Sequence, residues 1–239
     1  MKHIKISAGI AHFDYSRLGA NMKEAMDAGA DIVHADAADM VELPINLQLM
    51  GGPQIIEGFR KVTDKPIECH FYTSECDKIF IDRIAEVGCN MLILPAERFI
   101  GATLAYRMEW CKRLGMKIGL TIGCYTPLCF LDEAIYDIDR LHIVTHGTSN
   151  TDGKDNWYWR ESVLDLVQRA RKMIDEKNPK CELAIDGGIR TDNVEPLIEC
   201  NPDVVILSTA IFRNDKGITY AVKEFRDILD RLSEKYNLQ

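Results

Sequence analysis

Four side chains that can bind a metal or transfer a proton lie at the ends of short apolar runs in this sequence of 239 residues. His34 and Asp36 close one run, His70 closes the next, and Asp186 closes a run much later in the chain. In an extended strand, residues i and i+2 point to the same side, so His34 and Asp36 are expected to face one way together. Two imidazoles and two carboxylates suit a borderline divalent cation such as Zn²⁺, Fe²⁺, Co²⁺ or Mn²⁺.

Each of these residues also has a purely structural interpretation. A single histidine at the end of a strand is usually a hydrogen-bonded core residue, and an aspartate there is often a helix N-cap. The four residues also lack the local spacing of a zinc finger. Four such groups at three strand ends nevertheless favour a shared site over four separate structural roles.

The elements that must position these residues alternate along the whole chain. Near-continuous apolar runs are typical of parallel strands covered on both faces. They predict strands at residues 3–10, 31–36, 66–71, 90–95, 116–122, 141–145, 181–186 and 203–208. Stretches of helical period predict helices at 16–28, 53–62, 75–87, 98–114, 159–177 and 217–235, with shorter ones near 131–137 and 191–199.

Eight alternations without a linker or low-complexity segment predict an α/β fold, a single (β/α)₈ TIM barrel that spans residues 1–239 as one domain. That length lies within the usual range for one barrel. A doubly wound open sheet is the structural alternative, although no Gly-x-Gly-x-x-Gly follows the first strand to favour it. In a barrel, function is expected at the carboxyl ends of the strands, where the four side chains lie.

Three junctions between a helix and the next strand share one sequence pattern. Gly or Asn accepts the left-handed conformation that ends a helix, and an Asp or Asn then stands at the base of the strand. The three are Gly29-Ala30-Asp31, Gly88-Cys89-Asn90 and Asn201-Pro202-Asp203.

Composition narrows the class of protein. A formal net charge of −8 argues against a nucleic-acid or anionic-membrane surface, and the apolar stretches are too short to span a bilayer. The eight cysteines form no C-x-x-C pair, and no secretory signal precedes the first strand. We therefore expect a cytoplasmic protein with reduced, mostly buried thiols that binds neither nucleic acid nor a membrane.

Five segments carry a family resemblance. They are residues 28–39 (AGADIVHADAAD), 65–70 (KPIECH), 126–128 (TPL), 184–189 (AIDGGI) and 208–212 (STAIF). In this order and at these separations, the chain resembles the ribulose-phosphate 3-epimerase family over nearly its whole length. The resemblance implies a metal-dependent isomerase, an epimerase of a ketose phosphate such as a pentulose, hexulose or tetrulose phosphate.

The resemblance also implies roles for the four residues at the strand ends. His34, Asp36, His70 and Asp186 would ligate one divalent ion (Zn, Fe, Mn or Co), and Asp36 and Asp186 would be the acid–base pair. Inverting the carbon beside a ketone removes a proton from one face and returns one to the other, which two carboxylates on opposite faces can do. The metal would stabilise the enediolate between the two steps.

Departures from the family concern the residues expected to contact substrate. Methionines of the family's pocket are replaced at Ala38, Tyr72 and Val144, and the glycine-rich loop after the sixth strand is replaced by the unlike sequence of residues 145–159. An intact metal and acid–base set with a changed pocket indicates one chemistry applied to a different substrate.

Several other residues are candidates for substrate contacts. Gly187, Gly188, Ser208 and Thr209 could present backbone N–H groups to a phosphate. His12 and His146 fall in loops at the barrel mouth, where either could contact substrate. His142 lies inside the sixth strand and is expected in the core.

Other functions stay open at this point. The substrate could be an unphosphorylated keto-sugar, or the enzyme could move the carbonyl instead of inverting a centre. A metal-dependent lyase would need a cation near the metal, for which Lys154 and Arg190 are candidates. A non-catalytic sugar-binding barrel is disfavoured, since binding alone requires no pair such as Asp36 and Asp186. Barrels of this family commonly self-associate, so we expect a homo-oligomer.

Overall fold

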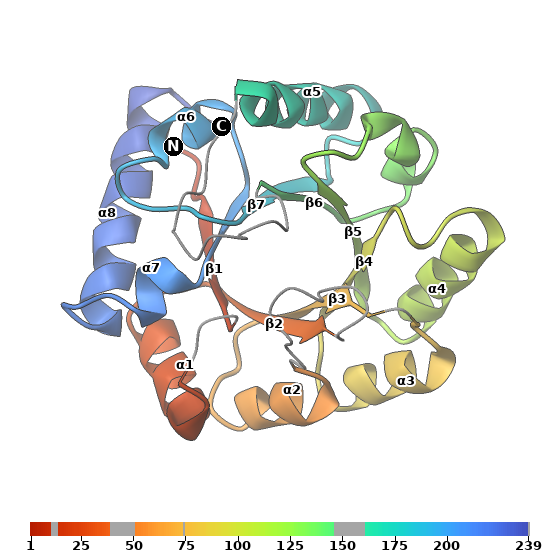
Figure 1. Cartoon of the computed structure of the whole chain (residues 1–239), viewed down its shortest axis with the longest axis horizontal. Coiled ribbons are helices and arrows are strands. Elements are labelled where there is room, and N and C mark those ends of the chain that lie inside the picture. The colour runs from red at the N-terminus through yellow and green to blue at the C-terminus, as the bar shows by residue number, and fades with distance from the viewer. Residues whose placement is uncertain (11–13, 39–50, 74, 146–160, 239) are drawn as a thin grey trace, which may run out of the picture.

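Eight parallel strands close into a barrel around the centre of the molecule (Figure 1). A computed structural model describes residues 1–10, 14–38, 51–73, 75–145 and 161–238. Each strand pairs with the next in sequence, and the last pairs with the first, which closes the sheet. The strands are β1 (Lys5–Gly9), β2 (Ile32–Ala38), β3 (Ile67–Tyr72), β4 (Met91–Pro95), β5 (Lys117–Gly123), β6 (Arg140–Val144), β7 (Glu182–Asp186) and β8 (Val204–Leu207). The predicted closed barrel is confirmed.

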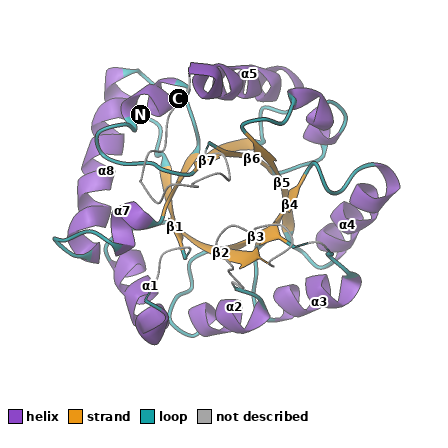
Figure 2. Cartoon of the chain, viewed as in Figure 1, coloured by secondary structure: helices purple, strands orange, loops and turns teal. Residues whose placement is uncertain are grey.

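A ring of helices covers the outside of the barrel (Figure 2). These are α1 (Leu18–Asp27), α2 (Pro53–Arg60), α3 (Lys78–Glu86), α4 (Gly101–Arg113), α5 (Glu161–Lys177), α6 (Glu195–Glu199), α7 (Thr209–Phe212) and α8 (Ile218–Lys235). The short helix predicted near 131–137 is formed by two 3₁₀ helices, η3 (Leu128–Leu131) and η4 (Ala134–Tyr136). Buried Leu128 and Leu131 are three residues apart, a spacing that 3₁₀ turns satisfy as well as an α-helix does.

The two faces of the sheet differ in chemistry. Outward-facing residues such as Ile6, Val33 and Leu120 belong to the large apolar core between strands and helices. Among the described residues, a second and smaller apolar cluster, Ile32, Ala184, Val204 and Ile206, faces the interior. Most of the buried polar side chains of the described residues occupy strands: Ser7, His34, Asp36, Glu68, His70, Thr121, Arg140 and His142. A polar interior of this kind needs partners for every group that it buries.

The base of the barrel repeats one hydrogen-bonded junction four times. An Asp or Asn directly precedes each even-numbered strand, and its side-chain oxygen accepts a hydrogen bond from a backbone N–H of the preceding strand. The backbone N–H of the same Asp or Asn donates to the carbonyl oxygen of that partner residue. The pairs are Asp31 with Ile6, Asn90 with Ile67, Asp139 with Ile118, and Asp203 with Leu183, at side-chain distances of 2.8, 2.8, 2.9 and 2.7 Å. The sequence predicted three of these positions at the strand bases, and Asp139 is the fourth.

The cysteines are free and mostly buried, as the sequence predicted. Of the eight, Cys129 is exposed. Across the described ranges, none of the helices has the length and apolar character needed to cross a bilayer.

Candidate active site

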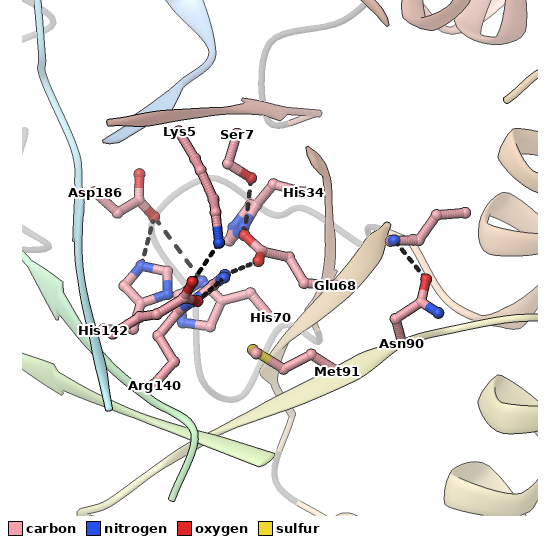
Figure 3. Close-up of polar contacts among 12 residues, drawn as sticks. Lys5, Ser7, His34, Glu68, His70, Asn90, Met91, Arg140, His142 and Asp186 are labelled. Atoms are coloured by element: carbon pink, nitrogen blue, oxygen red, sulfur yellow. Dashed lines mark hydrogen bonds and ion pairs between the residues drawn. The ribbon is translucent and has the colours of Figure 1, made fainter. Parts of the chain in front are cut away.

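Strand pairing brings the predicted residues together at the carboxyl end of the barrel. Asp36 on β2 lies beside His70 on β3, and His34 lies beside Glu68 in the same register. Asp186 ends β7 and approaches from the other side of the interior, as Figure 3 shows. Residues that are far apart in sequence therefore form one cluster.

The four side chains contact one another closely. His34 Nε2 is 3.3 Å from Asp36 Oδ1, and His70 Nδ1 is 3.5 Å from the same oxygen. His70 Nδ1 is also 3.9 Å from Asp186 Oδ2. The side chain of His70 is fully buried, whereas that of Asp186 is 20% exposed, so Asp186 is the member accessible to a ligand.

The donor set fits a divalent metal ion. One ligand atom each from His34, His70 and Asp186 lies within 4.8 Å of the others, and Asp36 adds an oxygen near both histidines. Within the described ranges, His34 Nε2 and both ring nitrogens of His70 are buried without a hydrogen-bond partner. Buried polar atoms of this kind call for a ligand or ion. Two imidazole nitrogens and two carboxylates match the preference of Zn²⁺ and similar ions.

Electrostatics keep the carboxylates charged. Burial alone would raise the pKa of Asp36, but its contacts with His34 and His70 outweigh burial and hold that pKa well below its usual range. Burial likewise opposes ionisation of Asp186, yet the hydrogen bond and charge of His142 lower its pKa. These contacts favour the ionised form of both carboxylates in the free protein, so one of them must take up a proton before it can act as an acid.

The two histidines have opposite titration behaviour. Burial, followed by the neighbouring His142, lowers the pKa of His70 to about 4, so its imidazole is neutral at pH 7. Burial also disfavours the charged form of His34, but the carboxylates of Asp36 and Glu68 raise its pKa well above the usual value. The pocket thus favours a positive charge next to His34, which a divalent cation would supply in place of the proton.

His142 is fully buried within β6, as expected, and it also belongs to this cluster. Its Nε2 lies 3.2 Å from Asp186 Oδ2, and its ring centroid is 4.2 Å from that of His70. A signal was present in the sequence. Arg140 and His142 are polar residues at i and i+2 in an otherwise apolar strand, the same pattern as His34 and Asp36.

Four of the six residues predicted to bind substrate lie within the described ranges. Gly187 and Gly188, with φ of 106° and 63°, follow β7 directly, and Thr145 Oγ1 donates to the carbonyl oxygens of Asp186 and Gly187 at 2.8 and 2.7 Å. Thr209 is the exposed first residue of α7. The predicted contacts of His12 and His146 lie outside the described residues.

Ser208 lies next to the histidine cluster. Its Oγ is buried without a hydrogen-bond partner among the described residues. A Cβ on Gly9 would be 3.4 Å from Ser208 Cβ and 3.7 Å from His34 Cδ2, so the glycine leaves room for both side chains. Ser208 and His34 thus both lie against Gly9 at the end of β1.

Tyr72 extends the site toward the barrel mouth. Its ring centroid lies 4.0 Å from that of His70. Burial, and then the charges of Asp186 and Asp36, raise the pKa of its phenol well above the usual value. The hydroxyl thus stays protonated and keeps a hydrogen that it can donate.

These features define a (β/α)₈ barrel with an imidazole–carboxylate site at the carboxyl ends of its strands. The sequence model of the ribulose-phosphate 3 epimerase family matches residues 5–212, and the chain belongs to that family. The family is named for a carbohydrate epimerase, which is an isomerase, and the chain is an enzyme of this class.

Curated relatives agree with the family assignment. The ribulose-phosphate 3-epimerase of Escherichia coli (strain K12) is 29% identical over 238 residues, which cover 98% of this chain and all of the relative. That of Bacillus subtilis (strain 168) is 28% identical over 210 residues, 87% of this chain and 92% of the relative.

Solved structures share the fold. The 3-hexulose-6-phosphate synthase of Salmonella typhimurium has a TM-score of 0.73 at 17% identity, covering 96% of this chain and all of that one. KGPDC from Streptococcus mutans has a TM-score of 0.72 at 14% identity, covering 97% of this chain and 99% of that one. At these identities the likeness shows the fold alone.

Proposed function

We propose that this chain is a metal-dependent epimerase that inverts the carbon beside the carbonyl of a ketose phosphate. Family membership and relatives named ribulose-phosphate 3-epimerase support a phosphorylated sugar as the substrate class. The changed pocket positions Ala38, Tyr72 and Val144 support a substrate that differs in detail from ribulose phosphate.

The observation that carries the proposal is the arrangement of two carboxylates around one imidazole. Asp36 comes from β2 and Asp186 from β7, and each has an oxygen within 4 Å of His70 Nδ1, at 3.5 and 3.9 Å. A substrate carbon between them would have one carboxylate on each face. Binding alone would not require this pair of bases.

The reaction follows from that arrangement. One ionised carboxylate accepts the proton of the carbon beside the carbonyl, and the electron pair of the C–H bond moves to form the enediolate. The other group, as a carboxylic acid, then donates its proton to the opposite face of that carbon, and the carbonyl is restored. Asp36 and Asp186 exchange these roles according to which epimer is bound, and solvent resets their protons between turnovers.

His34, Asp36, His70 and Asp186 would hold the divalent ion. When bound, this ion would act as a Lewis acid that stabilises negative charge on the substrate oxygens. Gly187, Gly188, Ser208 and Thr209 are proposed to bind the phosphate, with His12 and His146 as further substrate contacts. We also propose a cytoplasmic location and a homo-oligomeric state.

A lyase reaction is less well supported. It would need an unpaired cation beside the metal, and Arg190 instead lies 3.1 Å from Asp192 with its side chain 47% exposed. Lys154 lies outside the described residues. Arg140 faces the interior, but both Glu68 and Glu182 pair with it.

The test is turnover of ketose phosphates by purified enzyme, before and after removal of metal with a chelator. We expect epimerisation of at least one pentulose, hexulose or tetrulose phosphate, lost on chelation and restored by Zn²⁺, Mn²⁺, Fe²⁺ or Co²⁺. The matching unphosphorylated ketoses should react far more slowly. Full activity in metal-free enzyme, or a preference for the unphosphorylated sugar, would overturn the corresponding part of the proposal.

A further inference from the structure

A second carboxylate lies behind His34, on the side away from the candidate metal centre. Glu68 Oε1 is 2.7 Å from His34 Nδ1, and the hydroxyl of Ser7 donates to the same oxygen at 2.8 Å (Figure 3). The side chains of Glu68 and His34 are 2% and 1% exposed. This contact is therefore protected from competition with water.

The other oxygen of Glu68 pairs with Arg140. Arg140 Nη1 donates to Glu68 Oε2, and Arg140 Nη2 donates to Glu182 Oε2 at 2.6 Å. Lys5 donates to the remaining oxygen of Glu182. Two cations and two carboxylates thus balance, which is the condition under which buried charges are tolerated. Glu68 has no freedom to rotate away from His34 without losing Arg140.

This network decides which nitrogen of His34 is available. A carboxylate only accepts hydrogen bonds, so in the neutral imidazole the hydrogen must be on Nδ1. The lone pair is then on Nε2, the nitrogen that faces Asp36 at 3.3 Å and has no hydrogen-bond partner in the described part of the chain. Histidines that bind metals commonly have their second nitrogen fixed in this way.

We propose that Glu68, clamped by Arg140, is a positioning residue that fixes the orientation and tautomer of His34 for metal binding. The inference rests on the metal centre under Proposed function and adds residues that contact neither metal nor substrate. Glu68 acts through His34, so its removal should weaken the ion's binding and not merely slow turnover.

The substitution Glu68→Gln tests this positioning role, because it changes the group that faces His34 Nδ1. Glutamate offers one oxygen to His34 and Ser7 and the other to Arg140, whereas glutamine has a single acceptor oxygen. The charged guanidinium of Arg140 should capture that oxygen, which turns the NH₂ group toward His34. His34 Nδ1 must then accept, its hydrogen moves to Nε2, and the metal-binding lone pair is lost.

The measured quantity is the dissociation constant for Co²⁺, obtained by chelator competition, together with the visible absorption spectrum of the bound ion. E68Q should bind Co²⁺ about 10- to 100-fold more weakly than wild type, with an altered spectrum. Circular dichroism and thermal unfolding of the metal-free proteins establish that each variant folds. A folded E68Q that binds Co²⁺ within about twofold of wild type would overturn the proposal.

Two double variants separate positioning from packing and charge. E68Q/R140M and E68M/R140M each remove one charge of either sign, and apolar replacement of a buried ion pair often preserves folding. They differ in whether an acceptor faces His34 Nδ1. Without Arg140, the glutamine oxygen is free to turn to His34, so E68Q/R140M should bind Co²⁺ at least about fivefold more tightly than E68M/R140M. Equal affinities would contradict the proposed role even if E68Q alone failed to fold.

Asp203→Asn supplies the matched control. Asp203 pairs with Lys2 and Arg171 at 2.7 and 3.0 Å. It is thus a carboxylate in ion pairs, like Glu68, but it lies at the base of the barrel, away from the candidate metal centre. D203N should bind Co²⁺ within twofold of wild type, and a loss equal to that of E68Q would mean that general destabilisation explains both. Wild type that binds no Co²⁺ would instead contradict the metal centre itself, a result distinct from failure of the role of Glu68.

Discussion

Pairs of polar residues at alternating positions of apolar strands build the centre of this enzyme. His34 with Asp36, Glu68 with His70, and Arg140 with His142 all follow this pattern. The second residue of the first two pairs lies near a strand end, where function is expected, and was predicted. Glu68 and His142 lie inside apolar runs, and strand position alone did not distinguish them from core residues, while Arg140 precedes the predicted strand 141–145 and was not assigned to it. Each is two residues from another polar side chain and so points to the same face of its strand. The sequence does not say which face points into the barrel; the closed sheet does.

At His142, we predict that Leu substitution lowers kcat about 10- to 100-fold with less than a threefold change in KM. The imidazole contacts Asp186 at 3.2 Å and orients a proposed proton-transfer group, so its loss should impair the chemical step more than binding. Steady-state kinetics at saturating metal provide the test.

Gln at the same position is the matched control, because its amide can still donate to the carboxylate. H142Q should retain more turnover than H142L. Equal kcat values for H142L and wild type would show that Asp186 needs no partner on β6.

At the scale of the elements, the four junctions at the base of the barrel should stabilise the sheet. We predict that Asp139→Ala lowers the free energy of unfolding by about 1–3 kcal/mol, because the buried N–H of Ile118 loses its acceptor. Asp139→Asn should cost much less, since Asn90 already fills the equivalent position with an amide oxygen. Urea unfolding of the metal-free proteins measures both, and equal losses for the two variants would contradict this role of the side-chain oxygen.

Gly51, two residues before α2, lies against the backbone of β2 at Asp36. Its φ is +74°, and a Cβ there would lie 1.6 Å from the carbonyl oxygen of Asp36, so Gly51→Ala must displace the backbone of a site residue. We predict a fall in kcat/KM of more than about tenfold, because small displacements of catalytic groups are costly.

Gly115 is the matched control, because its φ is +76° and a Cβ there would have no atom within 4 Å. Gly115→Ala should cost only the backbone strain, about 1–2 kcal/mol of stability, and leave kcat/KM within twofold. If both variants keep wild-type kinetics, the contact between Gly51 and Asp36 does not control the site.

All eight strands were predictable, because each is a short apolar run bounded by turn residues. The type of helix between β5 and β6 was not predictable, since spacings of three and four residues suit both α and 3₁₀ helices. The junction at Asp139 was missed for a related reason. It follows Asp137-Ile138, without the Gly or Asn that marks the other three helix ends.

At the scale of the whole molecule, the charged interior should make stability depend on pH. Burial opposes ionisation of Glu182, but Arg140 and Lys5 lower its pKa below the usual 4.5. A carboxyl group with a lower pKa in the folded state stabilises that state above its ordinary pKa, and the contribution is lost as the pH falls through the folded value.

We therefore predict that Glu182→Gln destabilises the metal-free protein most above about pH 5, and that the difference from wild type shrinks as the pH falls below about 4. Free energies of unfolding measured across this range check the sign. A difference that is constant with pH would show that the ion pairs of Glu182 contribute nothing through their charge.

Exchange of the substrate hydrogen with deuterated water is the decisive test of the two-carboxylate mechanism. Wild type, Asp36→Asn and Asp186→Asn, each reconstituted to full metal occupancy, are incubated separately with the two epimers of the ketose phosphate that the enzyme turns over. Neither variant should epimerise, but each should still exchange the hydrogen of one epimer, D36N of one and D186N of the other, because each retains the base on one face. A variant that exchanges both epimers at the wild-type rate would contradict the assignment of Asp36 and Asp186 as the two bases.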